Sequence, residues 1–153
     1  MISKKTKYAL KALQYLAQNE KKGPILISEL AEKERIPKKF LEAILLELNK
    51  KGILQSKKGK RGGYSLAKPP EQITMGQVIR ILEGPLAPLP CVSQTAYMKC
   101  EECVDEQTCG IRLVMQEVRN ATASILDGTT LRDVLEREEQ AKMVHAGNLH
   151  FNI

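Results

Sequence analysis

The sequence predicts a mostly α-helical fold with one small β-hairpin, and three observations lead to this fold class. Apolar residues recur at helical spacing in three segments before residue 52. A glycine-rich stretch flanked by two short strand patterns follows them directly. In a later segment the apolar residues alternate spacings of three and four, as in a helix that packs along another helix. We therefore expect a winged helix-turn-helix domain joined to a long helix that packs along another helix.

The first 68 residues contain the elements of the winged domain. Ser3 can cap a first helix that ends near residue 18. Ser28 can cap a short second helix, ISELAEKE, which stops before Pro37 because the residue preceding a proline disfavours helical geometry. A third helix then runs from Pro37 to Gly52. The segment ILQSKKGKRGGYSLA completes the domain as a hairpin, with strands at 53–56 and 64–67 around a basic, glycine-rich turn.

Residues 69–142 form a second region of the chain. Thr74 and Gln77 make a capping box for a helix that ends at Gly84. Residues 85–110 form a proline-rich loop that contains all four cysteines, and the long helix follows at about 111–126. A last helix ends near Lys142. The tail 143–153 gives no clear signal and is a candidate for disorder.

Charge is distributed unevenly along the chain. Residues 1–70 carry 17 Lys or Arg against 6 Asp or Glu, a net +11, whereas residues 71–153 carry 7 against 12, a net −5. A basic first half suggests a polyanionic partner, although a solvated lysine surface explains the charge equally well. The sequence shows no signal peptide and no apolar run near the roughly 20 residues that span a bilayer. We therefore expect a cytoplasmic protein with reduced thiols and no membrane partner.

The predicted domain places its cations where double-stranded DNA would pass. Helix-turn-helix proteins put the second helix of the motif in the major groove, and a wing follows the backbone or the minor groove. The first turn of that helix also carries Glu42, a candidate for accepting a hydrogen bond from a cytosine amino group. An exposed glutamate paired with a nearby lysine is the alternative interpretation. The candidate phosphate contacts are Lys38, Lys39, Lys57, Lys58, Lys60 and Arg61.

The cysteines follow the pattern C-x8-C-x2-C-x5-C, at Cys91, Cys100, Cys103 and Cys109. Thiolates are soft ligands that suit iron–sulfur clusters and zinc. Structural zinc sites with four thiolates usually have two close pairs of cysteines, and only one such pair is present. An iron–sulfur cluster, zinc, and thiol sensing without a cofactor all remain open on the spacing alone.

Three stretches together resemble a known family: SKKTKYALKALQYLA, the segment from ISELAEKERIPKKFLEAIL through GILQSKKGKRGGYSLAKPPEQITMGQVI, and the cysteine loop. The chain is similar, up to about residue 135, to the bacterial transcription regulators that include IscR, NsrR, RirA and CymR, the Rrf-two (Rrf2) family. The resemblance implies a homodimer bound to a palindromic operator and joined through the long helix, so that residues 69–142 are the expected dimerisation region. It also implies base contacts from Glu42 and entry of Lys58 into the minor groove. Ala43 departs from the IscR pattern, so we expect a different operator sequence.

The resemblance further implies that Cys91, Cys103 and Cys109 hold an iron–sulfur cluster, of the 2Fe-2S or the 4Fe-4S type. Cys100 is then either a fourth ligand or an extra residue. Arg112 stands where IscR has a histidine ligand, and Tyr8 stands where some relatives supply a carboxylate from the partner subunit. Both departures favour coordination by cysteines alone.

The expected function is that of a dimeric transcription regulator, a repressor rather than an enzyme, that senses cluster status, redox state, nitric oxide or iron. One alternative keeps the DNA-binding module and drops the cluster: a thiol-redox sensor or a CymR-like regulator of cysteine metabolism. The other alternative is a metal-binding electron carrier. It has little support, because no histidine lies near the cysteines in the sequence and the basic wing would then have no purpose.

Overall fold

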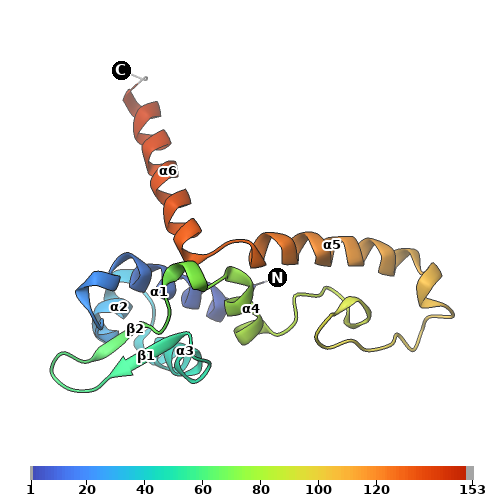
Figure 1. Cartoon of the computed structure of the whole chain (residues 1–153), viewed down its shortest axis with the longest axis horizontal. Helices are drawn as coiled ribbons and strands as arrows, with labels where there is room; N and C mark the ends of the chain where they lie inside the picture. The colour runs from blue at the N-terminus through green and yellow to red at the C-terminus, as the bar shows by residue number, and fades with distance from the viewer. Residues whose placement is uncertain (1, 151–153) are drawn as a thin grey trace.

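The computed structural model describes residues 2–150. Within that part of the chain, six α-helices and one antiparallel hairpin follow in the expected order (Figure 1), so the predicted fold class is confirmed. No helix among them is long and apolar enough to span a membrane. The elements are α1 (Lys4–Gln18), α2 (Ile27–Glu34), α3 (Lys38–Lys50), β1 (Leu54–Lys57), β2 (Gly63–Leu66), α4 (Met75–Glu83), α5 (Gly110–Asp127) and α6 (Leu131–His150).

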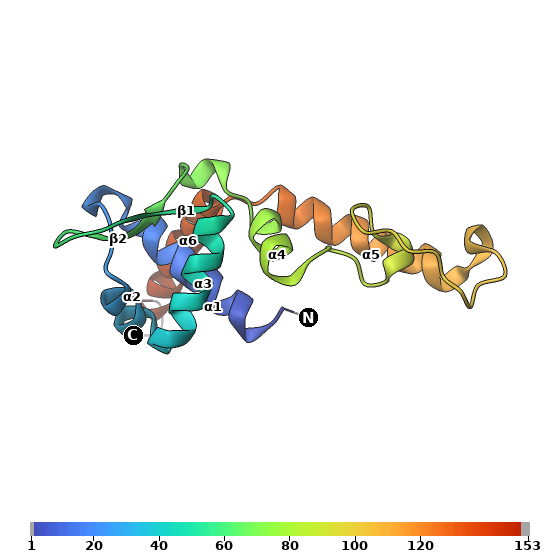
Figure 2. The same ribbon diagram turned by 90° about the horizontal axis from the view of Figure 1, so that it is seen from below.

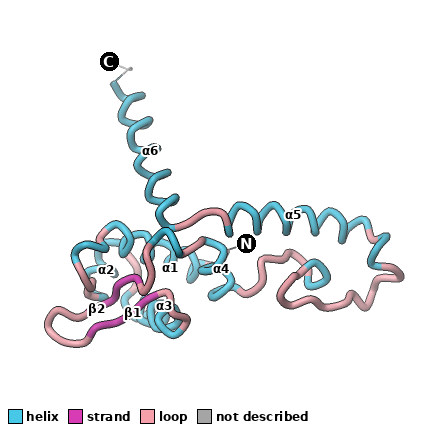
Figure 3. Tube along the Cα trace, in the orientation of Figure 1, coloured by secondary structure: helices cyan, strands magenta, loops and turns pink. Residues whose placement is uncertain are grey.

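The molecule consists of a body, an arm and a projecting helix. Helices α1, α2 and α3 and the β1–β2 hairpin form the body, with α4 beside it (Figures 1 and 2). Helix α5 extends away from the body as the arm, and the loop between α4 and α5 runs alongside it in both views. This loop has only short 3₁₀ turns, at Pro90–Val92 and Glu106–Thr108 (Figure 3). Helix α6 leaves the base of the arm in a different direction.

One hydrophobic core holds the body together. Leucines from α1 and α3, such as Leu13 and Leu45, are fully buried and follow the expected helical spacing. Truncation of one of them to alanine costs about 2–5 kcal/mol. The core continues beyond residue 68, where the predicted winged domain ends, because it also contains Ile73, Val78, Leu131 and Leu135. The bases of α4 and α6 are therefore packed into the same core as the winged helix.

Helix starts follow the expected capping in two cases and differ in a third. Ser3 accepts a hydrogen bond from Thr6 N at 3.2 Å, and the Thr74–Gln77 capping box is present. Helix α2, however, begins at Ile27 with Leu26 as its cap residue, and Ser28 lies inside the helix. The difference arises because Ile25 pairs with Tyr64 through two backbone hydrogen bonds of 2.8 Å, so the chain enters the helix directly from this bridge.

The last helix is longer than expected. The sequence predicts an end near Lys142 and no structure in the tail, but α6 continues to His150, and residues 151–153 lie outside the described part of the chain. Residues 143–148 lack a buried apolar stripe, which is why their helical character is hard to see from the pattern. The i,i+4 pair between Glu138 and Lys142, at 3.2 Å, stabilises the turn from which the helix continues.

The wing turn requires glycine at two adjacent positions. Gly63 has a φ of 145°, and a Cβ there would overlap the backbone carbonyl of Ile25. A Cβ at Gly62 would overlap the carbonyl of Lys57. The two glycines therefore let the hairpin close against residue 25 and direct its basic turn outward.

A substitution at Gly63 should destabilise the wing. We expect Gly63→Ala to lower the free energy of unfolding by about 1–3 kcal/mol, because it combines unfavourable backbone geometry with a steric overlap. Gly147→Ala in α6, where nothing lies within 4 Å of the added Cβ, is the control and should leave stability unchanged or higher. Urea denaturation of the two variants measures the difference, and equal stability would contradict this account.

The carboxylate of Glu83, at the end of α4, should make stability depend on pH. It accepts hydrogen bonds from Ser3 N at 2.7 Å and from Thr6 Oγ1 at 2.5 Å, and these bonds lower the pKa of Glu83 from its usual 4.5 to about 2. A lowered folded-state pKa means that the ionised group stabilises the fold fully above about pH 4.5, and that this contribution is lost as the pH falls towards 2.

We therefore expect Glu83→Gln to melt several degrees below the wild type at pH 7, and the gap to shrink below pH 4. The control is Glu32→Gln, at an exposed position in α2, which should melt with the wild type throughout. Thermal unfolding followed by circular dichroism from pH 7 to pH 3 provides the measurement. A gap that stays constant with pH would show that ionised Glu83 does not stabilise the fold.

Candidate nucleic-acid interface and cysteine loop

The first turn of α3 presents the predicted DNA-contacting side chains to solvent. Lys38, Lys39 and Glu42 are exposed, while Leu41 and Ile44 on the opposite side of the helix are fully buried. None of the ion pairs found within residues 2–150 involves Glu42. The alternative role of Glu42, as the partner of a nearby lysine, therefore has no support in this geometry.

The turn between α2 and α3 contains a residue that sequence reasoning did not single out. Arg35 ends α2 in a left-handed conformation with a φ of 54°, which is unusual for a residue other than glycine. Its backbone N–H donates to the carbonyl of Glu32, and Ile36 N donates to Ala31 O at 2.9 Å. The signal that could have revealed it is its place at the helix end, directly before the buried Ile36.

The wing carries its four cations at the end of β1 and on the turn that follows. Lys57, Lys58, Lys60 and Arg61 are all exposed, and β1 packs against α3. The hairpin and α3 lie on the side of the body opposite to α6 (Figure 1). The fold thus brings α3 and the hairpin, the two elements that carry the predicted DNA contacts, to one side of the body (Figure 1).

Helix α1 fixes the position of α3. Lys5 Nζ lies 2.5 Å from Glu47 Oε2. The rings of Tyr8 and Phe40 pack edge to face with centroids 5.7 Å apart. These contacts add to the shared core, so a shift of α1 would also move the candidate recognition helix.

Three of the four thiols lie together at the end of the cysteine loop. The thiols of Cys100 and Cys109 interact with that of Cys103 and raise its pKa to about 12, with Cys100 as the larger cause. Cys109 is also the N-cap of α5: its Sγ accepts from Arg112 N at 3.5 Å, and this backbone N–H is the main cause of the lowered pKa of Cys109. Cys100, which the sequence left as a fourth ligand or an extra residue, thus belongs to the group.

Cys91 is held differently from the other three. It is buried in the short helix Pro90–Val92, and its carbonyl accepts a hydrogen bond from Arg112 Nε at 3.3 Å. Arg112, which cannot ligate a metal, therefore links Cys91 to the N-terminus of α5. Within residues 2–150, no three His, Cys, Asp or Glu side chains are arranged so that they could hold a metal ion as they stand.

Glu106 organises the loop around the thiols, a role that sequence reasoning missed. Its carboxylate accepts hydrogen bonds from Tyr97 OH at 2.6 Å and from Cys100 N at 3.2 Å. The bond from Tyr97 is the main cause of the lowered pKa of Glu106. Only the acidic character of this loop was visible in the sequence, because the partners of Glu106 lie six and nine positions away in irregular backbone.

Helix α5 carries an exposed apolar stripe. Ile111, Val114, Val118 and Ile125 are between 46% and 68% exposed, at the alternating spacings that the sequence shows. A continuous exposed apolar stripe of this kind marks an interaction surface.

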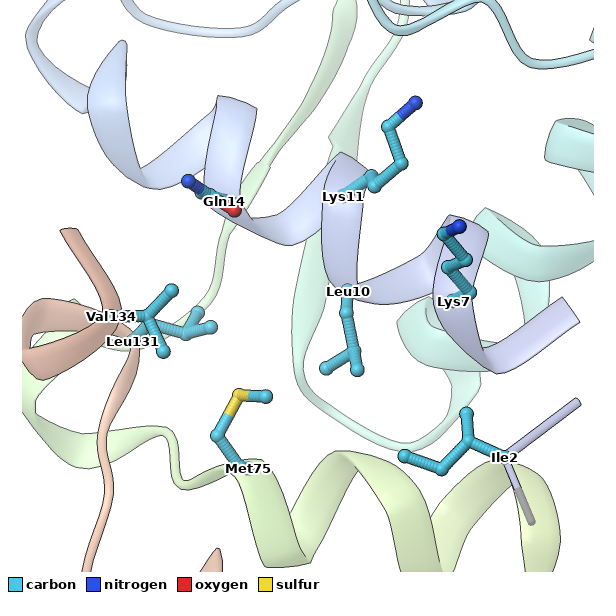
Figure 4. Close-up of a pocket in the computed structure, with 8 residues that line it drawn as sticks. All are labelled: Ile2, Lys7, Leu10, Lys11, Gln14, Met75, Leu131 and Val134. Carbon is cyan, nitrogen blue, oxygen red and sulfur yellow. The ribbon is translucent and has the colours of Figure 1, made fainter. Parts of the chain in front are cut away.

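An apolar cavity of about 350 Å³ opens at the base of the arm (Figure 4). It lies between α1, α4 and α6, and Leu10, Met75, Leu131 and Val134 contribute to its wall. No cysteine lines it, so this cavity and the cysteine loop are separate features.

The comparison with known proteins decides the family. A family profile described as "Iron-dependent Transcriptional regulator" matches residues 2–137. The chain belongs to the Rrf2 family. A putative HTH-type transcriptional regulator, rrf2-like, of Rhodobacter capsulatus is 44% identical over 88% of this chain and 92% of its own. The solved structure of CymR, the global cysteine regulator of Bacillus subtilis, has a TM-score of 0.75 at 30% identity, covering 90% of this chain and 97% of that chain. IscR of T. potens has a TM-score of 0.72 at 30% identity, covering 92% of this chain and 90% of that chain.

The protein is therefore a transcriptional regulator of the Rrf2 family with a winged-helix fold, and not an enzyme. The names of its relatives point to more than one signal, since the family profile is described as iron-dependent and CymR as a cysteine regulator. Membership in the Rrf2 family identifies the DNA-binding module but leaves the role of the cysteine loop open.

Proposed function

We propose that the protein is a cytoplasmic, homodimeric repressor that binds a palindromic operator and senses cluster status, redox state, nitric oxide or iron through an iron–sulfur cluster in its cysteine loop. The observation that carries the sensing role is the gathering of the Cys100, Cys103 and Cys109 thiols at the N-terminus of α5. This group lies on the arm, away from the body that carries the exposed cations of α3 and the wing (Figure 1).

The exposed stripe of α5 supports the dimer. Two copies related by a two-fold axis would bury this stripe against itself. The same symmetry places two copies of α3 on one duplex and predicts half-sites about one helical turn, roughly 34 Å, apart. The lysines of α3 and the wing would neutralise phosphates, Glu42 would read a base, and Lys58 would enter the minor groove.

The donor set of the loop fits an iron–sulfur cluster. Three thiols already lie together, thiolates are the usual cluster ligands, and irregular backbone can adjust around a cluster. Cys103 and Cys109 would be ligands with Cys91, and their grouping with Cys100 favours Cys100 as the fourth ligand. When bound, the cluster supplies a group that gains or loses electrons and that oxygen or nitric oxide can damage. Glu106 and Arg112 would hold the loop in position around it.

A second candidate is a cluster-free thiol sensor, or a regulator of cysteine metabolism that resembles CymR. The mutual influence of three neighbouring thiols without metal-binding geometry favours it. Oxidation of two of these thiols by a peroxide would form a disulfide, with two electrons and two protons passing to the peroxide. Hydrogen peroxide would give two molecules of water, and an organic peroxide would give one alcohol and one water. CymR of Bacillus subtilis is 30% identical over 94% of this chain and 98% of its own length.

Loss of one wing cation should weaken DNA binding without changing sequence preference. We expect Lys60→Ala, at an exposed wing cation proposed to contact phosphate, to reduce the slope of log affinity against log salt by about 1 and to lower affinity for specific and random duplexes by a similar factor. The control is Lys142→Ala, which removes the same charge from α6. Fluorescence anisotropy from 50 to 200 mM salt measures the effect, and an unchanged slope for Lys60→Ala would show that this wing cation does not contact the DNA.

Removal of the proposed ligands should abolish the cluster. We expect anaerobically purified wild type to show broad absorption between roughly 320 and 460 nm with matching iron and sulfide. Cys91→Ala, Cys100→Ala, Cys103→Ala and Cys109→Ala should each be colourless, whereas Val104→Ala, a fully exposed control in the same loop, should resemble the wild type. A wild type that stays colourless after anaerobic reconstitution would favour the thiol sensor, and full iron and sulfide in all four variants would refute the ligand assignment.

A further inference from the structure

We infer that Arg80, Asp127 and Gly76 form a joint that transmits the state of the cysteine loop through α4 to the DNA-binding helices. The inference rests on the proposed sensing function and names the residues that connect the sensor to the body. Arg80 and Gly76 belong to α4, and Asp127 is the last residue of α5, where the arm meets the body (Figure 1).

The joint is a two-point ion pair. Arg80 donates from both terminal nitrogens to Asp127, at 2.5 Å to Oδ1 and 2.8 Å to Oδ2. The geometry fixes orientation as well as distance, because two parallel hydrogen bonds between planar groups resist rotation. Among the residues described, this is the ion pair that joins α4 to α5.

Gly76 provides the space for this ion pair. A Cβ at position 76 would overlap Asp127 Oδ1 and come within 3.0 Å of the Arg80 guanidinium. Both groups are the ends of flexible side chains, so alanine at this position would displace the pair and leave the backbone of α4 undisturbed. Glycine inside a helix lowers helix stability, and room for Asp127 explains its presence here.

Backbone contacts anchor the chain that follows the arm. Met75 N donates to Thr129 O, and Leu131 N donates to Ile73 O, both at 2.9 Å. These bonds hold the short connection to α6 against the start of α4, and the Arg80–Asp127 pair holds the end of α5 against the middle of α4. An α5 of 18 residues is about 27 Å long, so a small rotation at this end corresponds to a large movement at the thiols.

Helix α4 connects the joint to the DNA-binding face. Its last residue, Glu83, binds Ser3 and Thr6 at the start of α1. Helix α1 in turn contacts α3 through the Lys5–Glu47 ion pair and the Tyr8–Phe40 ring contact. A continuous series of side-chain contacts therefore runs from the base of the arm to the candidate recognition helix.

Two apolar hollows border α4. One, of about 350 Å³, lies between α4, α1 and α6 (Figure 4). The other, of about 300 Å³, lies between α4, α5 and the start of the cysteine loop, with Ile79, Pro88 and Val118 among its lining residues. Val78 anchors α4 in the shared core, and the polar contacts of Arg80 and Glu83 add to this packing on either side of the hollows.

The cysteine loop is attached to both helices of the joint. It begins directly after α4 and ends at Cys109, the N-cap of α5. A rearrangement of the loop therefore displaces the end of α4 and the far end of α5 together. The Arg80–Asp127 pair restrains the resulting change in the angle between the two helices.

Two unrelated substitutions test the joint. Gly76→Ala displaces the ion pair without changing any charge, and Asp127→Asn weakens it without changing shape. The matched controls are Gly147→Ala and Glu136→Gln, both in α6. For each full-length protein, fluorescence anisotropy gives the Kd for a duplex selected from random sequence, once with the cluster reconstituted anaerobically and once after its removal by a chelator.

We expect both joint variants to keep full iron and sulfide and to bind the duplex in both states. The factor by which Kd differs between the cluster-bound and the cluster-free protein should be at least about fivefold smaller in the joint variants than in the wild type. The controls should keep the wild-type factor. If these residues had only a structural role, the variants would melt at a lower temperature and bind the duplex more weakly in both states by the same factor. Joint variants that keep the wild-type ratio of Kd values would therefore contradict the joint but not the proposed sensing function. A wild type with the same Kd in both states would overturn the proposed sensing function together with the joint.

Discussion

The hydrophobic core that the body shares with α4 and α6 is the constraint on which the rest of the structure depends. Because Ile73 and Leu131 lie in the same core as Leu41 and Leu45, the chain must leave the body after α4 and return to it before α6. Everything between these points, the cysteine loop and α5, lies outside the core. The cysteine loop and the arm thus form one segment outside the core, and both ends of this segment are fixed to the winged helix.

Sequence patterns predicted well the features that depend on local chemistry. Capping by Ser3 and Thr74, the break before Pro37 and the glycines of the wing turn follow from rules that involve residues a few positions apart. The end of α6 and the start of α2 were misplaced for a related reason. The first has no buried stripe to mark it, and the second depends on a bridge between Ile25 and Tyr64, far apart in sequence.

The candidate sites divide in the same way. The cations of the wing could be predicted because exposure at a tight turn follows from sequence. The grouping of Cys100 with Cys103 and Cys109 could not, since Glu106 determines it through contacts in irregular backbone. The pair of Arg80 and Asp127 was also invisible, because 47 positions separate the partners and only the fold shows that Gly76 makes room for them.

The separation of arm and body has a consequence for the evolution of such proteins. Insertions, deletions and ligand changes between Gly84 and Cys109 alter an irregular loop that contributes nothing to the shared core, so they carry little penalty for folding. The residues proposed to contact DNA and the residues proposed to detect a signal can thus diverge with little effect on the shared core. One scaffold can serve an iron-dependent regulator and a cysteine regulator, and a lineage can acquire a new signal while it keeps its existing set of operators.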